Sequence, residues 1–123
     1  MKTGVKILII DDSSTNNLLC KSILEESGYQ VIISDKSSQA LKLIRKEKPA
    51  LLLLDIMMPD VDGFEILSSL KADVLLKDIL VIMLSAKTDQ LSMKEAFEKG
   101  AIDYLLKPIA PGKLLKTVKK FLD

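Results

Sequence analysis

Residues that could do chemistry stand at the ends of four apolar runs in this 123-residue sequence. Together they offer three carboxylates, one hydroxyl and one ammonium: Asp11, Asp12, Asp55, Ser85 and Lys107. Oxygen atoms are the ligands that Mg²⁺ takes in proteins, usually one or two carboxylates together with a phosphate. These residue types therefore suit a site for a divalent cation and a phosphate group.

Asp55 is the candidate nucleophile, because it ends a run of four leucines at residues 51–54, which indicates a buried strand, and a loop follows it. Its carboxylate could attack phosphorus and form an aspartyl phosphate. Such a transfer requires that the charge on the equatorial phosphate oxygens be neutralised. The metal ion, the Lys107 ammonium and the Ser85 hydroxyl together could provide that neutralisation.

The ligand set also limits which metal could bind. Carboxylates that lie close together repel one another, so the pKa of each rises unless a cation lies among them. The sequence has no histidine, and Cys20 is its only cysteine. These counts exclude zinc–thiolate sites and Ser-His-Asp triads, and they favour Mg²⁺, with Mn²⁺ as an alternative. Cys20 lies among leucines and is expected to be packed rather than reactive.

Buried strands that alternate with amphipathic helices must position these residues. Strands are expected at residues 5–10, 30–34, 51–55, 79–84 and 102–106, with helices between them and a last helix from residue 111. This alternation is typical of an α/β domain, the flavodoxin-like doubly wound (βα)5 three-layer sandwich with a parallel sheet of order 2-1-3-4-5. In that order the carboxyl ends of the first and third strands flank the switch point, where we expect the site.

Helix boundaries and buried faces follow from capping residues and apolar spacing. The first helix is expected to begin near Ser13 and end at Gly28, and the second to be capped by Ser37 or Ser38. The next two helices are expected at residues 63–72 and 90–99. The side chains expected to face the core from the first and fourth helices are Leu18, Leu19, Ile23, Leu24, Met93, Ala96 and Phe97.

Composition favours one globular domain. The chain is 48% hydrophobic and carries a net charge of +1, so bulk charge does not favour contact with nucleic acid or a membrane surface. The beginning of the sequence lacks the pattern of a secretion signal, and its apolar runs are too short to cross a bilayer. We therefore expect a cytoplasmic protein.

Four segments, in order, resemble the receiver domain of two-component response regulators. They are IIDDSSTN at residues 9–16, LLLLDIMMPDVDG at 51–63, VIMLSA at 81–86 and GAIDYLLKP at 100–108. The resemblance covers essentially the whole chain and implies a single phosphoacceptor domain over residues 1–123. It implies a signalling switch rather than an enzyme with an outside substrate, because such domains catalyse only their own phosphorylation and dephosphorylation.

The resemblance also implies a role for each residue of the site. Asp55 corresponds to the phosphoacceptor. The ligands of Mg²⁺ would be Asp11, Asp12 and Asp55, with the backbone carbonyl of Met57 completing the set. Lys107 corresponds to the family lysine that faces the phosphoryl group.

A conformational switch is implied in the same way. Ser85 would move toward the phosphoryl group, and Tyr104, the switch aromatic, would rotate inward. The face formed by the fourth helix, fifth strand and last helix would then change shape. The Lys107–Pro108 bond is expected to be cis, and Lys87 is a flanking lysine that could reach the phosphoryl group.

The partners implied by the resemblance are proteins. The phosphodonor would be a sensor histidine kinase or a histidine phosphotransfer protein, and a downstream effector would bind the switching face. No direct contact with nucleic acid or membrane is expected. The chain could stand alone, or it could be a receiver domain of a hybrid sensor kinase or a longer regulator. The pair Asn16 and Asn17 is common in receivers of hybrid kinases.

Two other classes of protein are alternatives to a receiver domain. A phosphohydrolase with an aspartate nucleophile usually has a second acid two residues after it, where this chain has Met57. A flavodoxin-type cofactor protein would need a phosphate-binding loop after the first strand. Ser13, Ser14 and Thr15 partly satisfy that need, but the preceding aspartates would repel a phosphate.

Overall fold

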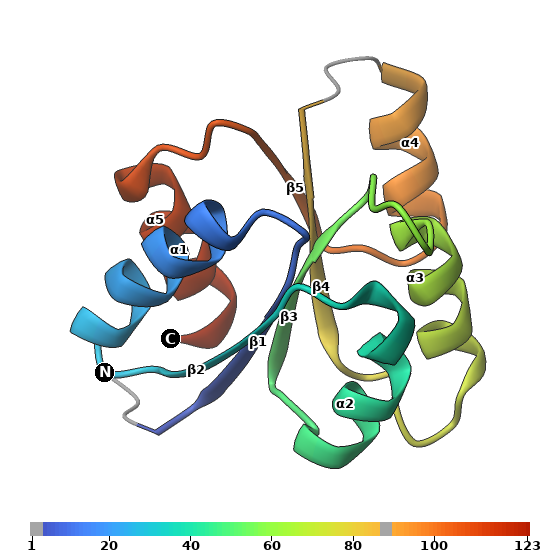
Figure 1. Ribbon diagram of the computed structural model, residues 1–123, viewed down its shortest axis with the longest axis horizontal. Helices are drawn as coiled ribbons and strands as arrows, with labels where there is room; N and C mark the ends of the chain where they lie inside the picture. Colours follow the sequence, from blue (N-terminus) through green and yellow to red (C-terminus); the bar gives the residue numbers. More distant parts are fainter. Residues whose placement is uncertain (1–3, 87–89) are drawn as a thin grey trace.

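The computed structural model describes residues 4–86 and 90–123, which form a parallel five-stranded sheet between two layers of helices (Figure 1). The strands are β1 Lys6–Ile10, β2 Gln30–Ser34, β3 Leu51–Asp55, β4 Leu80–Ser85 and β5 Asp103–Leu106. Their order across the sheet is β2-β1-β3-β4-β5, and every neighbouring pair is parallel. The predicted fold class and strand order are therefore confirmed.

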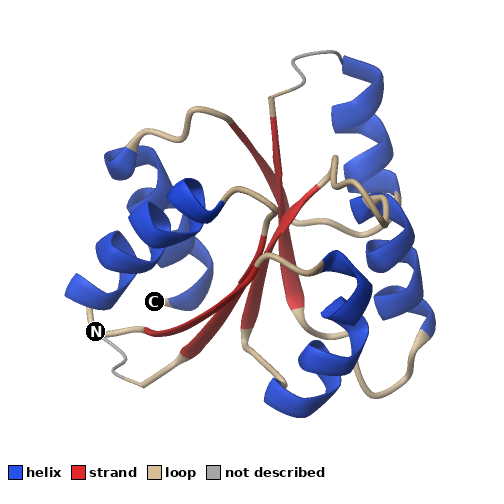
Figure 2. Ribbon diagram, in the orientation of Figure 1, coloured by secondary structure: helices blue, strands red, loops and turns tan. Residues whose placement is uncertain are grey.

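In the part of the chain that the structure describes, five α-helices cover the two faces of the sheet (Figure 2). They are α1 Ser14–Glu26, α2 Ala40–Glu47, α3 Gly63–Ala72, α4 Gln90–Glu98 and α5 Pro111–Leu122. Helices α1 and α5 lie on one face, and α2, α3 and α4 lie on the other. None of these helices is long and apolar enough to be a candidate membrane span.

The central strand β3 is buried over its whole length, because helices cover both of its faces. Side chains alternate between the faces of a strand, so its leucines belong to both halves of the core. Leu51 and Leu53 pack on the side of α1 and α5, whereas Leu52 and Leu54 pack on the side of α2, α3 and α4. This burial fixes the strand rigidly and leaves its last residue, Asp55, at the edge of the core.

The capping predictions are confirmed at one helix and wrong at another. Ser13 caps α1, and its side chain accepts a hydrogen bond from the backbone N–H of Asn16. At the second helix, Ser37 lies in a short 3₁₀ turn, Ser37–Gln39, that precedes α2. No side chain caps that turn or α2, and Ser37 is buried. The turn supplies backbone hydrogen bonding that a capping hydroxyl would otherwise give.

The predicted buried faces of α1 and α4 are partly wrong. Leu18 and Leu19 are 60% and 48% exposed, and Phe97 is 47% exposed. The residues buried on α1 are Asn17, Cys20 and Leu24, and those buried on α4 are Ser92 and Ala96. The buried face of α1 thus differs from the predicted one. It includes Asn17, whose amide donates to the backbone carbonyl of Asp11 over 2.8 Å.

Candidate functional site

Three aspartates meet at the carboxyl ends of β1 and β3. The two strands are paired, with Ile10 opposite Leu54, so the residues that follow them come together. One carboxylate oxygen from each of Asp11, Asp12 and Asp55 lies within 4.8 Å of the others. Asp11 and Asp55 are buried, whereas Asp12 is exposed. The structure thus brings the three predicted metal ligands into one cluster that is open on one side.

Lys107 places a cation on this cluster from the end of β5. Its Nζ lies 2.7 Å from Oδ2 of Asp11 and 3.4 Å from Oδ2 of Asp55. The backbone N–H of Lys107 donates to the carbonyl of Ser85 over 2.8 Å, which joins the ends of β4 and β5. The Lys107–Pro108 peptide bond is cis, as the sequence resemblance predicted. Lys107 therefore bridges the two buried carboxylates.

Burial and the charges of neighbouring residues shift the pKa values of Asp55 and Lys107. Burial, followed by the charge of Asp11, raises the pKa of Asp55 to about 7, although Lys107 opposes the rise. Burial alone would lower the pKa of Lys107, but its contacts with Asp11 and Asp55 raise it overall. A divalent cation among these oxygens would offset the repulsion. The oxygen ligands and their spacing fit Mg²⁺ or Mn²⁺.

The start of α1 holds Asp11 through three further hydrogen bonds. Oδ1 of Asp11 accepts from the backbone N–H of Ser13 over 3.0 Å, and Oδ2 accepts from Nδ2 of Asn16 over 2.9 Å. The amide of Asn17 binds the backbone carbonyl of Asp11. Neither asparagine was predicted to contact Asp11. The sequence did contain a signal for these contacts. Asn16 and Asn17 follow the N-cap Ser13 by three and four positions, which is one helical turn, so their side chains can reach back to the residues before the helix.

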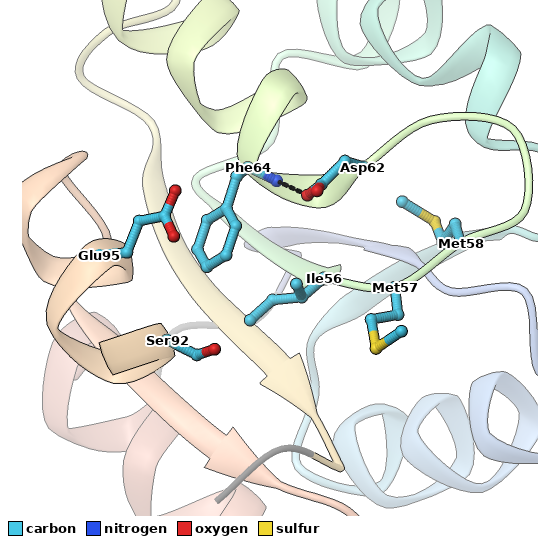
Figure 3. Close-up of a pocket in the computed structure, with 7 residues that line it drawn as sticks. All are labelled: Ile56, Met57, Met58, Asp62, Phe64, Ser92 and Glu95. Atoms are coloured by element: carbon cyan, nitrogen blue, oxygen red, sulfur yellow. Dashed lines mark hydrogen bonds between the residues drawn. The ribbon is translucent and has the colours of Figure 1, made fainter. Parts of the chain in front are cut away.

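The loop between β3 and α3 is held tightly where it leaves Asp55. The backbone N–H of Gly63 donates to the carbonyl of Ile56 over 2.7 Å. Asp62 caps α3 by accepting from the N–H of Phe64 over 2.8 Å (Figure 3). The side chain of Met57 is 61% exposed. That the backbone carbonyl of Met57 is a metal ligand stays a prediction.

A pocket of about 320 Å³ lies beside this loop, between it and α4. Figure 3 shows Phe64 and Ile56 directed toward Ser92 and Glu95 of α4. None of the aspartates of the cluster lines this pocket, and neither does Lys107. Lys107 lines a different and mostly apolar groove of about 410 Å³, together with residues that include Asn16, Pro108 and Ile109. The side chain of Lys107 is 21% exposed.

The two predicted switch residues lie on neighbouring strands. Ser85 ends β4 and is 1% exposed, while Tyr104 lies in β5 opposite Met83 and is 6% exposed. Tyr104 packs in the half of the core beneath α2, α3 and α4. Tyr104 is therefore buried in this structure, and its role in a conformational switch stays a prediction. Lys87, the flanking lysine, lies outside the described residues.

Known proteins that are similar in sequence to this chain differ in their total length. Alkaline phosphatase synthesis transcriptional regulatory protein PhoP of Bacillus subtilis (strain 168) is 39% identical over 117 residues, 95% of this chain and 48% of PhoP. Protein PilH of Pseudomonas aeruginosa is 36% identical over 95% of this chain and 97% of PilH. This chain thus spans about half the length of PhoP and nearly all of PilH.

Solved structures show the same fold. A putative response regulator from Chloroflexus aurantiacus J-10-fl superposes with a TM-score of 0.91 at 32% identity, covering 98% of both chains. Chemotaxis response regulator CheY4 of Vibrio cholerae superposes with a TM-score of 0.90 at 29% identity, covering 98% of this chain and 100% of CheY4. The sequence pattern of the response regulator receiver domain matches residues 7–119. Because this match spans most of the chain, the chain belongs to the response regulator receiver domain family of two-component signalling systems.

Proposed function

We propose that this chain is a phosphorylation-dependent switch that accepts a phosphoryl group on Asp55. The observation that carries the proposal is the cluster itself. Oxygens of Asp11, Asp12 and Asp55 lie within 4.8 Å of one another, and the Lys107 ammonium contacts the two buried carboxylates. Of the three aspartates, Asp55 stands at the end of the central strand. The negative charges of Asp11 and Asp12 and the positive charge of Lys107 lie beside it.

In the transfer, an oxygen of the Asp55 carboxylate forms a bond to phosphorus. The bond between phosphorus and the donor's imidazole nitrogen breaks, and that nitrogen takes the electron pair. Lys107 already lies 3.4 Å from Asp55, so a small movement away from Asp11 would pair it with a phosphoryl oxygen. Ser85 ends the adjacent strand and would donate its hydroxyl to another oxygen.

Asp11, Asp12 and Asp55 would hold Mg²⁺, or Mn²⁺ in its place, with the backbone carbonyl of Met57. When bound, the ion would neutralise charge on the transferred phosphoryl group. The protein's own contribution is to keep two of the carboxylates buried and fixed before the ion arrives. That preorganisation is supported by the hydrogen bonds from the start of α1 to Asp11.

Phosphorylation adds about 1.5 to 2 negative charges to the end of β3. The proposed response is a population shift, in which attraction of Ser85 to the phosphoryl group favours the inward conformation of Tyr104. The surface formed by α4, β5 and α5 would then present a different shape to an effector protein. The burial of Tyr104, which is 6% exposed, is compatible with an inward position of its side chain.

The phosphodonor would be a phosphohistidine, on a sensor histidine kinase or a histidine phosphotransfer protein, because this chain has no histidine of its own. A role as the receiver part of a longer regulator is favoured by a specific observation: PhoP has the same kind of segment in about half of its length. A role as a single-domain regulator is favoured by PilH, which this chain covers almost completely.

The proposal is tested by treating the protein with a labelled small phosphodonor, such as acetyl phosphate, in the presence of Mg²⁺. The wild-type chain is expected to take up label to at most one phosphoryl group, and Asp55→Asn is expected to take up none. Asp60→Asn is the matched control, because Asp60 is an exposed acid on the same loop. Full labelling of Asp55→Asn would contradict the assignment of the phosphoacceptor.

A further inference from the structure

Asp11 is the most completely buried member of the acidic cluster, and its carboxylate is bound on both oxygens. It is 0% exposed, and Oδ1 accepts from the backbone of Ser13. Oδ2 accepts from two donors, Nζ of Lys107 at 2.7 Å and Nδ2 of Asn16 at 2.9 Å. These two donors differ in charge and in freedom of movement. Lys107 is a flexible ammonium, whereas Asn16 is a short neutral side chain fixed in the first turn of α1.

The proposed function requires Lys107 to leave Asp11. In the described conformation, its ammonium is closer to Asp11 than to Asp55, where the phosphoryl group would form. When Lys107 moves to a phosphoryl oxygen, Oδ2 of Asp11 loses one of its two donors. A buried carboxylate oxygen without a donor is costly, so the donor that remains decides how readily the lysine can leave.

Asn16 is placed to be that remaining donor. A carboxylate only accepts hydrogen bonds, so the group of Asn16 that faces it must be the NH₂ group. This group carries no charge, so it can bind Oδ2 without competing with a metal ion for the site's negative charge. Hydrogen bonds to metal-ligating side chains orient those ligands, and their loss typically lowers metal affinity about 10- to 100-fold.

We infer that Asn16 is a positioning residue for Asp11: its amide holds Oδ2 in place for the metal ion while Lys107 is released to the phosphoryl group. The inference rests on the proposed function, and it assigns Asn16 no contact with the substrate. The effect of Asn16 must therefore pass through Asp11. It must also be visible in metal binding by the unphosphorylated protein, before any transfer takes place.

The test is a titration with Mn²⁺ alone, in which loss of the free ion's EPR signal reports binding. Asn16→Leu keeps the side-chain size and removes the donor, and Asn16→Ala removes it with the least disturbance of the helix. Both variants are expected to raise the Mn²⁺ dissociation constant about tenfold. Thr15→Ala is the matched control, because Thr15 is the exposed neighbour in the same helical turn. Its dissociation constant is expected to equal that of the wild type.

A second set of variants asks whether the effect passes through Asp11. In an Asp11→Ala background, adding Asn16→Ala is expected to change Mn²⁺ affinity less than twofold, because the carboxylate that Asn16 positions is gone. An equal tenfold loss of Mn²⁺ affinity in that background would overturn the inference, because Asn16 would then affect metal binding by a route that does not pass through Asp11. Unchanged Mn²⁺ affinity in both single variants would overturn it too. If the wild-type protein itself failed to bind Mn²⁺, the proposed metal-dependent function would fail instead.

Discussion

Gly63, the first residue of α3, lies directly against the backbone carbonyl of Asp55. A Cβ at this position would overlap that oxygen and would come within 2.8 Å of Cα of Ile56. The same glycine donates its N–H to the carbonyl of Ile56. The end of β3 and the start of α3 therefore share a backbone contact that leaves no space for a side chain, immediately beside the candidate phosphoacceptor.

Replacing Gly63 with alanine is expected to disturb both stability and the site. The added methyl group must push the backbone of Asp55 or the start of α3, and such overpacking costs about 1 to 3 kcal/mol. Urea denaturation measures the loss of unfolding free energy. Gly112→Ala is the control, because a Cβ built there comes within 4 Å of no described atom outside its chain neighbours and its own helix backbone. That variant is expected to be neutral or slightly stabilising, and equal losses in both would contradict the argument.

Replacing Lys107 with methionine is expected to slow phosphorylation of Asp55 by about 100-fold, as loss of a preorganised transition-state donor does. The variant keeps a similar stem and loses the ammonium that bridges Asp11 and Asp55. The initial rate of labelling by a small phosphodonor measures the effect at saturating Mg²⁺. Lys6→Met is the control, because Lys6 forms an ion pair with Glu47 at 3.1 Å that lies outside the acidic cluster. A normal rate in Lys107→Met would remove Lys107 from the mechanism.

Addition of Mg²⁺ is expected to stabilise the folded protein, because the three carboxylates are brought together only in the folded state. At a concentration about ten times the dissociation constant, linkage gives about 1.4 kcal/mol, which corresponds to a rise in Tm of roughly 4 to 7 °C. Differential scanning fluorimetry at constant ionic strength checks this shift. Asp12→Asn removes an exposed ligand without disturbing the core, and its shift should be smaller. A shift as large as that of the wild type would exclude Asp12 as a ligand.

Cys20 is expected to resist thiol reagents in the folded protein and to make stability depend on alkaline pH. Burial, with a smaller effect of Asp11, raises the pKa of its thiol from 9.0 to about 11. The folded state therefore holds the thiol proton more tightly, so this contribution is complete below pH 9 and is lost as pH rises toward 11. Between pH 8 and 10 the loss should be about 1 kcal/mol in unfolding free energy.

The matched variant for this prediction is Cys20→Ala, which removes the titrating group from the buried face of α1. Its unfolding free energy will be lower at every pH because of the lost packing. The quantity to compare is the slope between pH 8 and 10, which should be shallower than in the wild type. Equal slopes, or rapid labelling of native Cys20 at pH 8, would show that the thiol is not protected as the structure indicates.

The sequence by itself determined the strands, the fold class and the members of the acidic cluster. These features are local: an apolar run of the length of Leu51 to Leu54 predicts a buried strand, and a polar residue at its end marks the edge of the sheet. Parallel strands place their carboxyl ends along one edge, so Asp11, Asp55 and Lys107 could be assigned to one site before the tertiary structure was known.

Only the tertiary structure decided how these residues contact one another. Lys107 lies closer to Asp11 than to Asp55, at 2.7 Å against 3.4 Å, and no local pattern reports this difference because the three residues are far apart in the sequence. On α1, Asn17 is buried and donates to the backbone carbonyl of Asp11, whereas Leu18 is exposed. Apolar spacing along a helix cannot report such a bond, because it joins a polar side chain to a strand end whose position is fixed by packing across the whole sheet.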